Sequence, residues 1–214
     1  MTGPQALPNI LEITPYKGGE KMVDAHKLSS NENPLGCSPA AQAAVAEAAK
    51  HMELYPDGSA AALREAIGGK YGIDADRIVC GAGSDEIFQL LGRAYLRPGD
   101  NIVQSQHGFL VYRLIAQQAG AETRSAPEKD LTTDVDAMLE RVDENTKIVF
   151  LANPNNPTGS YIPYSEVKRL PRLPQSLGLI CYQRSRERLV RRYRLKAERW
   201  SHRLRSQHIR EGRQ

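Results

Sequence analysis

The 214-residue sequence has few cysteines, few aromatic residues and no long apolar run. Its three cysteines, Cys37, Cys80 and Cys181, stand far apart, so they form neither a disulfide framework nor the paired spacing of a zinc site. Every apolar run is much shorter than the roughly 18 residues that cross a bilayer. The first twenty residues lack the basic start and apolar block of a secretory signal. We therefore expect a cytoplasmic protein with no metal and no membrane partner.

Acidic residues become scarce towards the end of the chain. Residues 1–170 contain 16 Lys and Arg against 22 Asp and Glu, whereas residues 171–214 contain 13 against 3, and the last aspartate is Asp143. The composition therefore changes from that of a globular protein to an arginine-rich tail. We expect an amino-terminal arm at 1–36, a folded domain at 37–180, and a tail at 181–214 that is disordered or forms a lone helix.

Glycines, prolines and capping residues divide residues 37–170 into alternating helices and strands. Ser38, Ser59 and Ser84 each precede a helical pattern and are predicted caps, and Thr133 or Asp134 is the predicted cap of a later helix. The short apolar runs predict strands at 78–80, 101–105, 121–127 and 147–152, with a further candidate at 177–184. This alternation predicts an α/β fold, with a largely parallel sheet between two layers of helices.

Two loops lie where ligands gather in such a sheet, at the carboxyl ends of strands. The first, GAGS at 81–84, can offer backbone N–H groups and a helix N-terminus to a phosphate, although Ser84 can equally be only a helix cap. The second, NPNNPTG at 153–159, contains two Asn-Pro pairs whose restricted backbone can hold side-chain amides rigidly. Both loops are therefore candidates for a ligand site.

Five motifs, in order and with matching spacing, resemble one family. They are LSSNENPLG at 28–36, LYPDGSAAALREAIGGKYG at 54–72, GAGSDEIFQLLGRAYLRPGDNIV at 81–103, HGFLVYRLIA at 107–116, and NPNNPTG. Over about residues 8–170 the sequence is similar to the histidinol-phosphate aminotransferases, which are fold type I enzymes that use pyridoxal 5'-phosphate. The resemblance implies an incomplete three-layer αβα large domain at 37–180. It also implies amino transfer between histidinol phosphate and 2-oxoglutarate, with glutamate as the amino donor or product, in histidine biosynthesis.

The same resemblance assigns cofactor contacts to residues of the two loops and their neighbours. Ala82, Gly83 and Ser84 would hold the cofactor phosphate. Phe109 would stack on the pyridine ring, because a flat apolar face suits a flat cofactor; the alternative is a core position on the helix that follows. Asn156 would donate a hydrogen bond to the ring hydroxyl oxygen.

Three further residues belong to the expected site. Tyr55 would reach the cofactor phosphate of a partner subunit, because the family forms homodimers with shared active sites. Tyr16 would approach the substrate, and Asn33 lies in the arm that folds over the site in the family. Surface packing is the alternative for both tyrosines.

The sequence departs from the family in the groups that carry out the chemistry. Transamination with this cofactor needs a lysine to bind it covalently and an acid beside its ring nitrogen. The 177–184 candidate strand carries no aspartate, and the lysines beyond Asp143 are Lys147, Lys168 and Lys196, none in the small, serine-rich surroundings of the family's lysine. We therefore assign no catalytic residue and expect this chain to be truncated and inactive alone. A translation frame change near residues 175–183 is the hypothesis that explains the tail.

Two other functions remain open at this point. Threonine-phosphate decarboxylases share much of the amino-terminal pattern. Nonspecific nucleic-acid binding is the other, because eleven arginines between Arg184 and Arg213, with Tyr193 and Trp200 among them, could contact phosphates and bases. Solvated or unselected sequence explains the same composition, so nucleic acid is not an expected partner.

The missing lysine gives a direct test. The purified chain, incubated with pyridoxal phosphate and reduced with borohydride, should carry no stoichiometric covalent adduct on any one lysine, because no lysine has the family's surroundings. Peptide mass mapping measures this. An adduct concentrated on Lys147, Lys168 or Lys196 would contradict the expectation.

Overall fold

A computed structural model describes residues 5–14, 32–33, 35–170 and 179–183. Its main sheet has the strand order β2-β1-β5-β6, and all three neighbouring pairs are parallel. The strands are β1 (Asn101–Ser105), β2 (Glu122–Ala126), β5 (Thr146–Ala152) and β6 (Leu179–Gln183). The predicted parallel sheet is confirmed, and the 177–184 candidate is a strand beside β5. The expectations for Tyr16 and for the tail beyond residue 183 lie outside the described residues.

Helices cover both faces of this sheet. Successive residues of β1 and β5 point alternately to the two faces. Ile102, Ile148 and Phe150 pack with the helices α4 (Gly83–Tyr95) and α5 (Leu110–Gln118). Val103 and Val149 pack in a second cluster with α6 (Val135–Leu139) and α7 (Tyr164–Val167). Both faces of the central strands are therefore buried, as the expected three-layer α/β architecture requires.

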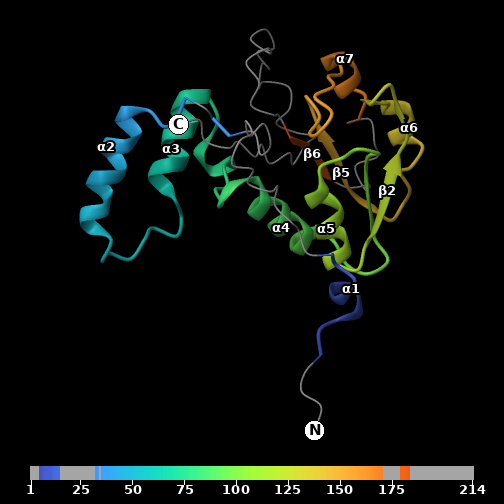
Figure 1. Cartoon of the computed structure of the whole chain (residues 1–214), viewed down its shortest axis with the longest axis horizontal. Coiled ribbons are helices and arrows are strands. Elements are labelled where there is room, and N and C mark those ends of the chain that lie inside the picture. Colours follow the sequence, from blue (N-terminus) through green and yellow to red (C-terminus); the bar gives the residue numbers. More distant parts are fainter. Residues whose placement is uncertain (1–4, 15–31, 34, 171–178, 184–214) are drawn as a thin grey trace, which may run out of the picture.

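The helices that follow α1 along the chain lie away from the sheet (Figure 1). They are α2 (Pro39–Ala48) and α3 (Ala61–Tyr71), with the short 3-10 helices η1 (Ala49–His51) and η2 (Ala75–Arg77). Within the described chain, α2 buries no residue and α3 buries only Gly68. Several large apolar side chains of this region are exposed, namely Val45, Met52, Leu54 and Leu63. We call residues 39–77 the α2–α3 arm.

A short helix and a pair of short strands were not predicted from the sequence. Helix α1 (Pro8–Leu11) lies against α5, where Asn9 Nδ2 donates to the carbonyl oxygens of Gln117 at 2.9 Å and Gln118 at 3.2 Å. Strands β3 (Glu128–Lys129) and β4 (Thr132–Thr133) form an antiparallel hairpin after β2. Among the described residues, no helix is long and apolar enough to cross a membrane.

The predicted caps had mixed outcomes. Ser38 caps α2, where its hydroxyl accepts from Ala41 N at 3.1 Å, and Asp134 caps α6. The prediction for Ser59 is wrong, because Asp57 performs this role: its carboxylate accepts from Ala61 N at 2.9 Å and from the Ser59 hydroxyl at 2.7 Å. A charged acceptor two residues earlier outcompetes the hydroxyl for the free N–H groups of α3.

The predictions around residue 80 also need correction. Residues 78–80 pair with no strand among the described residues, and Val79 is 48% exposed, so the predicted buried strand is wrong. Ser84 is not a cap, because it lies inside α4 and is buried. Instead, Glu86 Oε2 accepts from Ala82 N at 2.5 Å at the start of the helix.

One face of α4 is buried. Its buried positions are Ser84, Ile87, Phe88, Leu91 and Gly92, whereas Leu90 is 42% exposed. At Gly92 an added Cβ would come within 3.3 Å of Ile115 Cβ. Helix α5 therefore lies close against this face of α4.

A polar network joins the amino ends of β1 and β5. Asn101 Nδ2 donates to Asp143 Oδ1 at 2.8 Å, and the Thr146 hydroxyl donates to Asn101 Oδ1 at 2.7 Å. Arg124 from β2 donates to Asp143 Oδ2 at 2.5 Å. The hydrogen bond from Asn101, with a contribution from Arg124, lowers the pKa of Asp143 to about 2 from 3.8, although partial burial opposes this shift. One carboxylate thus connects three strands.

Replacing this carboxylate should weaken the sheet in a pH-dependent way. Because the pKa of Asp143 is lowered in the folded state, its contribution is present above about pH 5 and is lost as the pH falls towards 2. Asp143→Asn should lower the free energy of unfolding by about 1–2 kcal/mol at pH 7. Urea unfolding between pH 7 and 3 measures the difference, which should shrink with falling pH. Glu144→Gln, an exposed neighbour, is the control. A difference between the Asn variant and wild type that is independent of pH would contradict this account.

Candidate functional site

The carboxyl ends of β1 and β5 bring the loop that contains Phe109 next to the NPNNPTG loop. These strands are adjacent and parallel, and each is followed four residues later by a candidate site residue, Phe109 after Ser105 and Asn156 after Ala152. The loops also touch directly, because Asn155 Nδ2 donates to the His107 carbonyl oxygen at 3.0 Å. The sheet therefore places the ring of Phe109 and the amide of Asn156 on neighbouring loops at one edge.

The asparagines of the NPNNPTG loop have different roles. Asn153 is buried and pairs with the backbone of Ile162, donating at 2.9 Å and accepting at 3.0 Å. Asn155 is also buried and donates to the Thr158 hydroxyl at 3.0 Å. The Asn153-Pro154 and Asn156-Pro157 peptide bonds are both cis. Asn156 is half-buried, and its side chain makes no hydrogen bond within the part of the chain that the structure describes. The loop therefore leaves one amide available to a ligand.

Phe109 lies at the start of α5 and is partly buried. Its ring packs against the core cluster, with centroids 6.5 Å from Phe88 and 5.8 Å from Tyr112. Phe88 belongs to α4, one turn after Ser84, so the aromatic contacts also bring the start of α4 near Phe109. One side of the ring is supported by the core, and part of the residue stays accessible to a flat ligand. The core role and the stacking role are thus compatible.

The glycine loop has features that suit a phosphate. Gly83 has φ +74 at the start of α4, and a Cβ built there would meet nothing within 4 Å. Ser84 is 8% exposed, and among the described residues its hydroxyl has no protein partner. N–H groups of the first helical turn have no intrahelical acceptors and attract anions. The Ala82 N–H is already bound to the Glu86 carboxylate, so a phosphate would have to share or displace that contact.

The other predicted site residues are less closely tied to this edge. Tyr55 is 98% exposed in the turn before α3. Asn33 is exposed and makes local contacts, accepting from Leu35 N at 3.1 Å and donating to Gly36 O at 2.9 Å. Neither residue is linked to the two loops by a hydrogen bond among the described residues, so both remain predictions.

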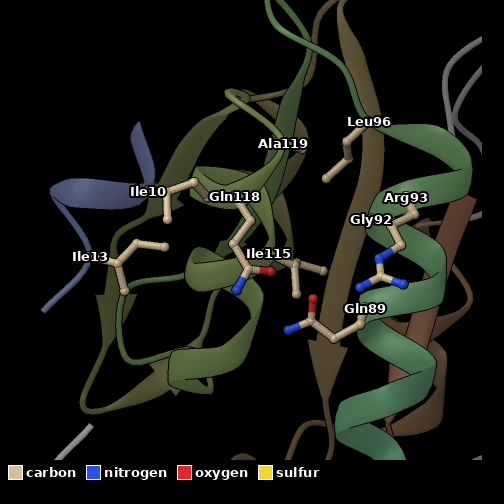
Figure 2. Close-up of a pocket in the computed structure, with 9 residues that line it drawn as sticks. All are labelled: Ile10, Ile13, Gln89, Gly92, Arg93, Leu96, Ile115, Gln118 and Ala119. Atoms are coloured by element: carbon tan, nitrogen blue, oxygen red, sulfur yellow. The ribbon is translucent and has the colours of Figure 1, made fainter. Parts of the chain in front are cut away.

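A cavity of about 590 Å³ lies elsewhere, between α1, α4 and α5 (Figure 2). It has an apolar lining that includes Ile10, Leu96 and Ile115, with the polar ends of Gln89, Arg93 and Gln118 turned towards it. The lining residues from α4 belong to the second half of that helix, whereas the glycine loop is at its opposite end. The cavity is therefore not the candidate site.

A hydrogen-bonded pair of Glu128 and His107 was not predicted from the sequence. Glu128, at the start of the β3–β4 hairpin, has a side chain only 2% exposed, and its Oε2 lies 2.8 Å from His107 Nδ1. Its Oε1 accepts from His107 N at 3.0 Å. Burial alone would raise the pKa of Glu128, but the hydrogen bonds from His107 and Ser105 lower it overall. HGF directly after a strand was the available signal, but its acidic partner lies 21 residues later.

The sequence of this chain matches one known protein family. The model for aminotransferase class I and II matches residues 23–182, which is most of the chain. The chain belongs to this family. The matched residues include the central strands β1 and β5 and the loops that follow them.

Curated relatives within this aminotransferase family carry a more specific name. The chain is 58% identical over 175 residues to the histidinol-phosphate aminotransferase of Rhodopseudomonas palustris, covering 79% of this chain and 48% of the relative. It is also 58% identical over 176 residues to the enzyme of the same name from Maricaulis maris, covering 80% and 49%. The resemblance found from the motifs is confirmed. The chain spans about half the length of the curated relatives it matches.

Solved aminotransferase structures support the fold assignment. The histidinol-phosphate aminotransferase of Sinorhizobium meliloti, determined in complex with pyridoxal-5'-phosphate, superposes with a TM-score of 0.74 at 26% identity. The alignment covers 82% of this chain and 49% of that protein. The histidinol-phosphate aminotransferase of Clostridium acetobutylicum shares the fold, with a TM-score of 0.63 at 24% identity over 72% of this chain and 45% of that protein.

The backbone at Gly83 gives a test of the glycine loop. Gly83→Ala should lower the free energy of unfolding by roughly 1 kcal/mol, because an L-residue is strained at this positive φ even though its Cβ has space. Gly58→Ala is the matched control, since its Cβ is also unhindered and its φ is not in the left-handed region. Urea unfolding of both variants measures the contrast. Equal stability of the two would show that Gly83 does not hold this conformation in solution.

Proposed function

We propose that this chain provides the amino-terminal half of the pyridoxal-phosphate site of a histidinol-phosphate aminotransferase. The observation that carries the proposal is the contact between the loops after β1 and β5, which puts Phe109 and the available amide of Asn156 at one edge. The 58% identity to enzymes of that name supports the choice of substrates, histidinol phosphate with 2-oxoglutarate or glutamate. It also favours an aminotransferase over a threonine-phosphate decarboxylase.

The cofactor phosphate would lie at the start of α4. Ser84 would donate its backbone N–H and its hydroxyl, and Gly83 would donate its N–H in place of its present contact with Gly81 O at 2.8 Å. The helix N-terminus carries a partial positive charge that favours a dianion. Ala82 N would contribute if Glu86 moves aside, since that carboxylate repels a phosphate at the same donor.

Phe109 and Asn156 would orient the pyridine ring. The Phe109 ring is held by Phe88 and Tyr112, so it can act as a fixed platform. Asn156 would donate its amide hydrogen to the ring hydroxyl oxygen, in the direction that the two rigid Asn-Pro pairs impose. Bound pyridoxal phosphate supplies an electron sink for amino transfer. The contribution of these residues is to bind the ring, fix its plane and shield one face from water.

A homodimer would complete the site. Tyr55 is almost fully exposed, so its hydroxyl is free to reach the phosphate in a partner subunit. The exposed apolar side chains of the α2–α3 arm, including Val45, Met52 and Leu54, favour a covering surface rather than water. Tyr16 and Asn33 would approach the substrate from the amino-terminal side. A cytoplasmic location suits a biosynthetic enzyme of this kind.

Binding of pyridoxamine phosphate to the full chain tests the proposal without requiring a covalent lysine. The chain should bind pyridoxamine phosphate at least about tenfold more tightly than pyridoxamine, because charge-assisted hydrogen bonds to the phosphate contribute about 1.5–3 kcal/mol. Ser84→Ala should reduce this preference for the phosphate. Asn156→Ala should weaken both ligands equally, because it removes a contact to the ring. Isothermal titration calorimetry of both ligands with each variant measures these differences.

Ser38→Ala provides the matched control, because it removes a serine that caps α2 and has no role in the site. It should leave both affinities unchanged. Equal binding of pyridoxamine and pyridoxamine phosphate to the wild-type chain would refute the proposed phosphate site.

A further inference from the structure

The buried Glu128 carboxylate is the first member of a hydrogen-bonded chain across three loops. Its two oxygens hold the backbone N–H and the imidazole of His107, and the His107 carbonyl accepts from Asn155. Asn155 continues to Thr158, whose hydroxyl lies 2.7 Å from Ser160 Oγ. Ser160 Oγ donates to Leu131 O at 2.7 Å, back in the β3–β4 hairpin. The path is therefore closed at the hairpin.

The two residues proposed to contact the cofactor ring are close in sequence to members of this path. Phe109 is two residues after His107, and Asn156 is next to Asn155. Gly108, between His107 and Phe109, lies close against the preceding residues, since its N–H donates to Ser105 O at 2.9 Å and an added Cβ would lie 3.0 Å from Gln104 Cδ. A displacement of His107 would therefore be passed on to Phe109 on one side and to Asn155 on the other.

We propose that Glu128 is a positioning residue that acts through His107 to fix the Phe109 loop and the Asn155–Asn156 loop relative to each other. The inference rests on the proposed function for its link to the cofactor. The carboxylate contacts neither ring nor amide directly. It restrains His107, which in turn accepts from Asn155, so that the stacking face and the amide donor meet a ligand in one geometry.

Burial explains why this carboxylate can hold both loops. A charged acceptor shielded from water makes stronger hydrogen bonds than an exposed one, and removal of one partner leaves the other buried group unpaired. Glu128 has this shielding, because its side chain is 2% exposed, whereas Glu122 at the start of β2 is 62% exposed and pairs with Arg124. The two residues are therefore a matched pair for a test.

The experiment measures pyridoxamine phosphate binding to full-length variants by calorimetry. Glu128→Ala should weaken binding about tenfold, a loss expected from one charge-assisted hydrogen bond. Glu128→Gln keeps an acceptor for His107 N and should recover most of the affinity, and Glu122→Ala should bind as wild type does. Glu128→Ala combined with Asn155→Ala should lose less affinity than the product of the two single losses, because both break one path. Full additivity of the two losses would overturn the coupling.

Amide hydrogen exchange on the ligand-free variants separates this inference from the proposed function. In Glu128→Ala, exchange should accelerate both at 106–109 and at 154–160, and Glu128→Gln should restore protection in both segments. Acceleration confined to 106–109 would overturn the coupling even if the cofactor binds. If the wild-type chain binds no pyridoxamine phosphate, the proposed function fails. The exchange rates of the two segments in Glu128→Ala would still show whether Glu128 couples the two loops.

Discussion

The parallel pairing of β1 with β5 is the constraint on which the site depends. Two parallel neighbours end at the same edge, so the segments that follow them must lie next to each other. The polar network of Asn101, Asp143 and Thr146 fixes the amino ends of this pair, where the register shifts between Asn101 and Ile102. The carboxyl ends are fixed by Asn155 and His107. The same two strands are thus tied at both ends, by charged and amide groups rather than by apolar packing alone.

Much of this fold could be predicted from the sequence because its central strand β5 is apolar on both faces. Runs such as KIVFLA have no other stable location than a buried sheet between helices, and their order along the chain implies parallel pairing. The same reasoning failed at Ile78, where three apolar residues are too few to indicate a strand. Capping predictions failed where two acceptors compete, as at Asp57 and Ser59. The spacing of residues in the sequence does not show which of two possible acceptors will bind the free N–H groups of a helix.

The site was predictable to the extent that it is local. The glycine loop and the NPNNPTG loop are contiguous motifs, and the structure gives Asn156 and Phe109 neighbouring loops. Glu128 could not be found in this way, because it meets His107 only after the chain has passed through α5 and β2. Its short hairpin has no strong sequence pattern. Interactions that depend on tertiary folding, and not on a motif, hold the motif residues in place.

The folding of the α2–α3 arm is only weakly coupled to the folding of the sheet. The sheet and its helices share two continuous cores, whereas α2 contributes no buried residue to either. Helices of this length are marginal by themselves in water. Heating should then melt the arm independently of the sheet, and a single transition midpoint would describe only the latter. Cooperative unfolding of the whole chain would require another protein surface that packs on the arm.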